Sequence, residues 1–142
     1  MNGVSQITHE TLSGTSVLVS NGGEETLPWT STFGPDTLLD RSSPTQPVVI
    51  EAGVYAIHAD TIQDDAMTVG GFYRATLTVG GGDQVVSVSP PSNADEQFPQ
   101  ASTLVIVRYL TPSDTIELVI ENHDGVNDIN FGQAGSIIQR IS

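Results

Sequence analysis

The chain has 142 residues and no cysteine, which is typical of one domain and excludes a disulfide framework or a thiolate metal site. Seventeen acidic residues against four basic ones give a net charge of −13, which disfavours nucleic acid and anionic membranes as partners. The first residues show no secretory signal, and no apolar run approaches the roughly 20 residues that span a bilayer. We therefore expect a soluble protein that folds inside the cell that makes it.

The acidic composition, in which all four basic residues are arginines, has two interpretations. One is a high-salt habitat, where a carboxylate-rich surface stays hydrated and its repulsion is screened. The other is a GC-rich genome that favours arginine over lysine. Abundant Thr, Val, Ile, Ser and Gly predict an all-β protein.

The amino-terminal third carries weak strand signals. Residues 1–14 show no clear period and predict an N-terminal arm or a frayed first strand, ahead of a single domain over 15–142. A short strand is predicted over 15–20, and a weak one over 37–40. Between them, Pro28 confines its segment to a sheet edge or a bulge, because proline cannot donate to a ladder.

The stretch from Val48 to Ile62 is the strongest signal in the chain. Its apolar residues fall on both faces, with one break at Gly53, so it predicts a strand buried on both sides. A small antiparallel domain buries such a strand only by having a partner. Residues 72–79 then alternate cleanly, and the glycines at 80–82 predict a hairpin onto 85–89.

The second half continues as strands. Apolar, β-branched residues predict strands over 102–110 and 115–122, followed by a long loop over 123–135. The last strand, 136–141, is apolar on both faces and belongs in a sheet interior. With about ten short strands and no helix, the chain is predicted to be a two-sheet antiparallel sandwich, a jelly roll.

Four segments, in order, resemble the tumour necrosis factor / complement globular-head superfamily. They are EAGVYAIHAD, FYRATLTVGGGDQV, STLVIVRYLTPSDTIELVI and NFGQAGSIIQRI, and together they cover about residues 47–142. Two features depart from the family pattern: Ser113 stands where glycine is usual before Asp114, and FGQAGSII is longer than the usual Phe-x-Gly. The resemblance implies a ten-strand antiparallel two-sheet jelly roll, a TNF-like sandwich that forms homotrimers.

The same resemblance implies where the trimer interface lies. The strands at 53–61, 115–122 and 136–141 would share an inner sheet, with one face in the core and the other against neighbouring subunits. Glu117 and Glu121 would then crowd on the trimer side, so an arginine partner is expected, Arg140 or Arg108. The implied interface residues are Val54, Tyr55, Ala56, His58, Glu117, Val119, Ile138 and Arg140.

Catalysis is not expected, because no nucleophile elbow, zinc-binding helix motif or phosphate-binding loop is present. A cupin-like enzyme would need two histidines and a carboxylate together, whereas His9, His58 and His123 lie on an arm, a strand and a loop. His58, beside Asp60, could be a metal ligand or a pH switch. A hydrogen-bonded interface histidine is the favoured interpretation.

No cofactor is expected, with one weak metal candidate. Asp124, Asn127 and Asp128 place oxygen ligands around a glycine, which suits Ca²⁺. The spacing is not that of an EF-hand, and the same residues are common in turns, which is the favoured interpretation.

The predicted function is that of a virion structural protein, by analogy with jelly rolls of tailed viruses of bacteria and archaea. It would be a trimer that decorates the capsid or projects from it as a turret or spike. Its partners would be itself and other virion proteins such as a major capsid protein, and it would be made in the host cytoplasm. The alternative is a receptor- or glycan-binding head of a virus fibre or cell-surface adhesin, using the loops at 62–71, 90–101 and 123–133 with Phe98 and Phe131.

Overall fold

The structure is a computed structural model, and it describes residues 6–12, 17–33, 38–63, 67–80, 82–92, 101–131 and 133–141. Thirteen strands and no helix are found in these ranges, so none of them holds a helix that could cross a membrane. The all-β prediction is confirmed.

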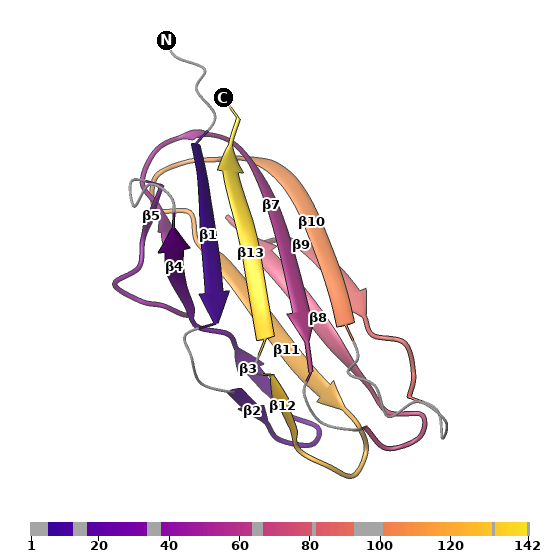
Figure 1. Ribbon diagram of the computed structural model, residues 1–142. Coiled ribbons are helices and arrows are strands. Elements are labelled where there is room, and N and C mark those ends of the chain that lie inside the picture. Colours follow the sequence, from indigo (N-terminus) through magenta and orange to yellow (C-terminus); the bar gives the residue numbers. More distant parts are fainter. Residues whose placement is uncertain are drawn as a thin grey trace.

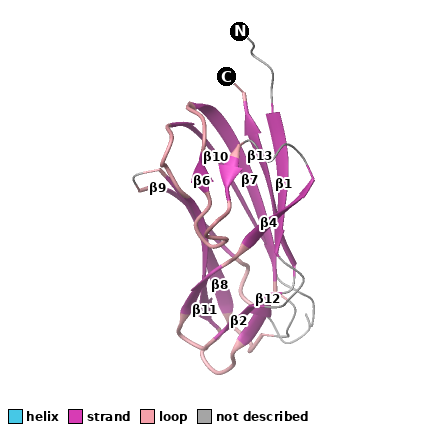
Figure 2. Cartoon of the chain, turned by 90° about the vertical axis from the view of Figure 1, so that its left-hand side faces the viewer, coloured by secondary structure: helices cyan, strands magenta, loops and turns pink. Residues whose placement is uncertain are grey.

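Two antiparallel sheets form the two layers of the sandwich (Figures 1 and 2). The five-stranded sheet has the order β10 (Ala101–Leu110), β7 (Gly53–Ile62), β13 (Gln133–Arg140), β1 (Gln6–Leu12) and β4 (Trp29–Phe33). The four-stranded sheet has the order β3 (Glu24–Thr26), β11 (Ile116–His123), β8 (Phe72–Val79) and β9 (Asp83–Val88). Two short ribbons complete the fold: β2 (Val17–Val19) with β12 (Ile129–Phe131), and β5 (Leu39–Asp40) with β6 (Val48–Val49).

The core lies between the two sheets and follows the alternation of their strands. On β7 every second residue is buried, including Tyr55 and Ile57, while their neighbours face outward and are half-buried. β8 and β11 alternate in the same way, with Leu77 and Leu118 pointing at the opposite sheet. Successive side chains of a strand point to opposite faces of its sheet. The alternation in the sequence therefore predicted correctly which side chains of these strands point into the core.

Pro28 stands where the chain crosses from one sheet to the other. Leu27 is buried and its N–H donates to the Leu118 carbonyl of β11 (2.8 Å). Trp29, also buried, starts β4, and its N–H donates to the Pro44 carbonyl (2.8 Å). Since β3 and β4 are edge strands of the two different sheets, the prediction that Pro28 marks an edge is confirmed.

The turn after β10 also joins the two sheets. Ser113 has a φ of 82°, the only positive φ among the described residues that are not glycine. Its neighbour Asp114 closes the turn by accepting the Thr111 N–H (2.7 Å). The left-handed backbone explains why the family that the sequence resembles favours glycine at this position.

Two expectations about the strands are wrong, and a third is decided between its alternatives. Of the arm and the first strand predicted for the N-terminal residues, the structure shows a strand: residues 6–12 form β1, paired with β13 on one side and β4 on the other. The loop expected over 123–135 contains β12 and the first residues of β13. The strand β11 lies in the four-stranded sheet, not beside β7 and β13. The prediction that β13 lies in a sheet interior is confirmed, because β7 and β1 flank it.

Candidate functional site

The outward side of the five-stranded sheet carries an unusual number of apolar side chains on β10, β7 and β13. Across these strands Val105 and Ile137 flank His58, and in the next row Val107 and Gln139 flank Ala56. The exposed side of an antiparallel sheet is ordinarily polar, so this surface is a candidate for covering by another molecule. We call it the apolar face, made of Val54, Ala56, His58, Val105, Val107, Tyr109, Ile137 and Gln139.

The exposure of these side chains is large. Tyr109 is 65% exposed, Val105 57%, Val107 48% and Ile137 41%. At the outward positions of β7, β10 and β13 whose side chains the structure describes, only His58 and Asp60 are acidic or basic. His58 Nε2 lies 3.4 Å from Asp60 Oδ1, which also accepts the Thr103 hydroxyl (2.8 Å). The face is therefore nearly free of charge on a strongly acidic chain.

A depression interrupts the apolar face between β10, β7 and β13. Its volume is about 220 Å³, and it is lined by Ala56, Ile57, His58, Val105, Ile137 and Gln139. The small side chain of Ala56 lies between the longer ones of Val107 and Gln139 in the same row. This difference in length leaves a hollow with apolar walls and two polar groups, the imidazole and the Gln139 amide.

Seven of the eight predicted interface residues fall into three groups. Val54, Ala56 and His58 face outward on β7, as predicted. Tyr55 and Ile138 are buried in the sandwich core, at 0% and 1% exposure, so their placement at an interface is wrong. Glu117 and Val119 lie on β11 and face outward on the four-stranded sheet, the other side of the molecule from the apolar face.

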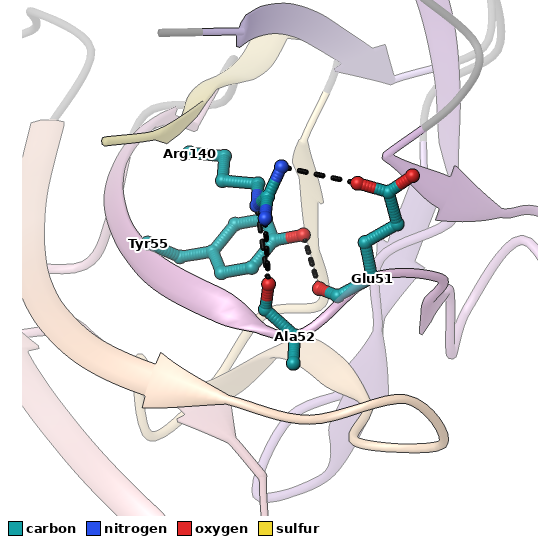
Figure 3. Close-up of polar contacts among 4 residues, drawn as sticks. All are labelled: Glu51, Ala52, Tyr55 and Arg140. Atoms are coloured by element: carbon teal, nitrogen blue, oxygen red, sulfur yellow. Dashed lines mark hydrogen bonds and ion pairs between the residues drawn. The ribbon is translucent and has the colours of Figure 1, made fainter. Parts of the chain in front are cut away.

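Arg140 serves a structural contact at the end of β13, shown in Figure 3. Its Nη1 pairs with Glu51 Oε2 (3.0 Å), while Nε and Nη2 donate to the Ala52 carbonyl (3.2 and 2.9 Å). The Tyr55 hydroxyl donates to the Glu51 carbonyl (2.8 Å), and burial raises the pKa of that hydroxyl. These contacts hold the bend just before β7 and so set the start of that strand.

The prediction that Arg140 or Arg108 pairs with the β11 glutamates is wrong. Glu121 pairs with Arg74 of β8, and Glu117 accepts from the Gln46 amide. Arg108 pairs instead with Asp83 (3.0 Å). The hydrogen bond from Arg74 holds the pKa of Glu121 below its usual value.

The outward side of the four-stranded sheet has the opposite character. It forms a broad hollow of about 470 Å³. We call this surface the polar face, and its lining is Glu24, Arg74, Thr76, Thr78, Gln84, Val86, Glu117, Val119 and Glu121. Three carboxylates and one guanidinium make it acidic and well hydrated.

Asp124, the first of the calcium candidates, is buried and acts as a turn cap. Its Oδ1 accepts the Asn127 N–H and the Thr68 hydroxyl (both 2.7 Å) and the Val126 N–H (3.2 Å), while Oδ2 accepts the Thr68 N–H (2.5 Å). Burial raises the pKa of this carboxyl, but the hydrogen bonds from Asn127, Thr68 and Val126 outweigh it, and the net pKa is lowered.

The other two candidates have separate partners. Asn127 donates its amide to Thr68 (3.0 Å), and Asp128 Oδ1 accepts the Asn21 N–H (2.9 Å). In the described part of the chain no three acidic or histidine side chains gather as a metal site. Protein donors occupy the Asp124 oxygens, and calcium at this loop stays an untested prediction.

Of the two aromatic residues predicted to serve ligand loops, only Phe131 lies within the described part of the chain. Phe131 is fully buried on β12 and meets the Tyr73 ring edge to face (centroids 4.8 Å apart), so it is a core residue. Phe98 lies outside the described residues. Sequence reasoning missed Val105, Val107 and Tyr109, although their strand is apolar on both faces, which is the signal that marked β7.

Comparison with known proteins rests on structure alone, because no family model and no curated protein matches this sequence. The PRD1 vertex protein P5 superposes with a TM-score of 0.71 at 15% identity, over 99% of this chain and 100% of that one. Murine APRIL at pH 5.0 gives 0.66 at 12% identity, over 95% and 98%. Eiger TNF from S. frugiperda gives 0.58 at 14% identity, over 98% and 92%.

These likenesses, taken with the sheet topology, define the fold. The chain is a TNF-like jelly roll, as the sequence motifs predicted. Structures with this fold include a virus vertex protein, murine APRIL and an Eiger TNF. At such low identity the likeness describes architecture, and function must be inferred from this chain's own surfaces.

Proposed function

We propose that this protein is a non-enzymatic structural protein of a virion, a homotrimer that decorates the capsid or projects from its surface. The observation that carries the proposal is the apolar face on a fold shared, end to end, with a virus vertex protein. The apolar face gives a physical reason for the chain to assemble with itself. The likeness to the vertex protein supports a location on a virus particle.

The apolar face supports assembly on energetic grounds. Burial of apolar surface is worth about 25 cal/mol per Å², and a stable interface buries roughly 1,200–2,000 Å² in total. Val105, Val107 and Tyr109 follow one another along the outward side of β10, and Ile137 lies across β7 from Val105, so one face of the sheet offers several apolar side chains for that burial.

The titratable groups with shifted pKa values support a structural role. Asp124 caps a turn, Glu121 pairs with Arg74, and Tyr55 anchors the bend before β7. Tyr73, whose pKa burial raises, hydrogen-bonds Thr61 (3.0 Å) inside the core. Each of these groups is engaged in holding the fold, which favours a binding or structural protein over an enzyme.

Light scattering of the purified protein tests assembly. We expect a mass three times the 15.0 kDa of the chain. A stable monomer at micromolar concentration would contradict the proposal.

The virion assignment has its own test. Antibodies raised against the purified protein should label the outside of virus particles in immunogold micrographs, and its gene should lie beside a major capsid protein gene. Absence of the protein from washed particles, by mass spectrometry, would overturn the assignment. A receptor or glycan head is less well supported, because Phe131 is buried and offers no ring to a ligand.

A further inference from the structure

We propose that the trimer closes head to tail, with Tyr109 of each protomer seated in the depression around Ala56 of the next. This inference rests on the proposed trimer and adds which residue of one copy meets which surface of its neighbour. Both surfaces belong to the apolar face.

Symmetry sets the first requirement. A two-fold dimer joins a patch to the same patch, whereas a closed ring of three needs two different patches that fit one another. The apolar face provides two such patches. One is the depression of about 220 Å³, and the other is the projecting ring of Tyr109 near the end of β10.

Tyr109 has the properties of the inserted group. At 65% exposure it is the most exposed side chain of the apolar face, standing beside Val54 of β7. An aromatic ring buries a large area while fixing only two torsions, and tyrosines are enriched at the centres of interfaces for that reason. An exposed tyrosine among valines therefore marks an anchor.

The depression has the properties of the receiving site. Its volume lies below the roughly 300–1,000 Å³ of small-molecule pockets, so it suits a single side chain. Val105 and Ile137 give it apolar walls against which a ring can pack. The His58 imidazole and the Gln139 amide offer hydrogen-bond partners to a phenol hydroxyl, which an inserted tyrosine needs and a phenylalanine would not use.

The distribution of charge favours another copy of this chain as the molecule that covers the apolar face. Each chain carries −13, so two copies repel one another wherever their carboxylates meet. Between the described side chains of the apolar face and its surroundings on β7, β10 and β13, only Asp60 would bring a carboxylate into the contact, and it is already paired with His58 and Thr103. Copies of this acidic chain therefore bring fewer carboxylates together at the apolar face than at the polar face, which is lined by three glutamates.

Cysteine cross-linking tests the contact, because the native chain has no cysteine to compete. At a protein concentration high enough to hold the trimer without the Tyr109 ring, the double variant Tyr109→Cys with Ile137→Cys should give a covalent trimer under mild oxidation on a non-reducing gel. The two cysteines cannot join within one chain, because β7 lies between β10 and β13 and places the strands about 9.6 Å apart, at roughly 4.8 Å per strand.

Matched variants make the result specific. Each single cysteine alone should give no covalent product, and a mixture of the two singles should give covalent dimers. Tyr109→Cys with Val86→Cys, on the polar face, should give none. Efficient dimerisation of Tyr109→Cys alone would overturn the inference, because it would place each tyrosine against its symmetry mate.

Binding strength gives a second readout. Tyr109→Ala should weaken trimer formation by at least about 30-fold, the size expected of an interface anchor, while Tyr109→Phe should weaken it less. A trimer by light scattering that neither cross-links nor responds to Tyr109→Ala would overturn this inference and leave the proposed function standing. A wild-type monomer would overturn the proposed function itself.

Discussion

The two outward faces of this sandwich are built from strands with the same alternation, yet they present opposite surfaces to solvent. On the five-stranded sheet the outward rows read Val105, His58, Ile137 and Val107, Ala56, Gln139. On the four-stranded sheet the corresponding positions include Arg74, Glu121 and Glu117, with the charges paired or hydrogen-bonded within the chain.

The contrast shows that a jelly roll does not need two equivalent sides. On the polar face Arg74, Glu117 and Glu121 have partners within the chain, whereas the apolar face leaves valine, isoleucine and tyrosine side chains without cover. On their inward sides, both sheets pack against one common hydrophobic core. A binding function is therefore expected on the five-stranded sheet, whose outward positions are apolar where polar residues are usual. The predictions below test this contrast between the two faces.

The largest effect is expected from a charge placed on the apolar face. Val107→Asp should abolish the trimer, because burying an unpaired carboxylate costs roughly 3–5 kcal/mol at each contact. The single protomer should still fold, since Val107 is 48% exposed within one chain. The matched control is Val86→Asp on the polar face, 50% exposed, which should leave the mass by light scattering unchanged. A trimeric Val107→Asp variant would remove the distinction between the faces.

Truncations on the two sides of β11 compare the core with the polar face. Leu118→Ala should lower the free energy of unfolding by about 2–5 kcal/mol, because it opens a cavity between the sheets. Val119→Ala, one residue on and facing outward, should change it by no more than about 0.5 kcal/mol. Urea unfolding at a fixed protomer concentration measures both. An equal loss for Val119→Ala would show that the polar face is also covered.

Asp124→Asn should destabilise the loops without affecting either face. The loss is expected to be about 1–3 kcal/mol at pH 7, since the carboxylate serves four donors. Because the folded pKa is lowered, this stabilisation is complete above the unfolded pKa of about 3.9 and is lost as the pH falls through the folded value. Melting curves from pH 7 to pH 2.5 should show wild type and variant converging in acid, while both keep the trimer mass at pH 7.

Ser113→Gly should stabilise the turn that joins the two sheets. A side chain at a φ of 82° is strained by about 1 kcal/mol, and glycine removes the strain. The gain is reduced because glycine is also freer in the unfolded chain. A melting temperature that falls would show that the strain at Ser113 is smaller than the cost of glycine's extra freedom in the unfolded chain, together with any contact of the serine side chain.

The smallest effect expected is that of salt. Raising the ionic strength from about 0.01 M to 1 M shortens the screening length from roughly 30 Å to 3 Å, which weakens repulsion among the carboxylates. The melting temperature of the trimer should rise by a few degrees, and less so when Glu24 and Glu117 of the polar face are changed to Gln. An unchanged melting temperature would leave genome composition as the explanation of the acidic surface.

The sequence predicted the inward side chains best where polar and apolar residues alternate. Residues 72–79 are β8 as predicted, and Tyr73 and Leu77 are buried. On β13 the neighbours Ile137 and Ile138 are both isoleucine, so alternation could not say which one faces inward. The structure places Ile138 in the core and Ile137 on the apolar face.

Sheet membership was predicted less well than strand position. The strand at 115–122 was found, but its sheet was not, because pairing with β8 and β3 joins residues far apart in the sequence and leaves no local signal. For a related reason, β1 was predicted only as an alternative to an N-terminal arm. Its residues have no apolar period, and it is held in place by ladders to β13 and β4.

The crossing at Pro28 has a mechanical consequence. Two residues, Leu27 and Pro28, separate the edge strand of one sheet from the edge strand of the other, and flanking hydrogen bonds fix both ends of the link. The two layers are thus coupled through covalent backbone at this edge as well as through side-chain packing. A sideways force on the apolar face would pass to the opposite layer through this link, so the sandwich should resist sliding of one sheet over the other.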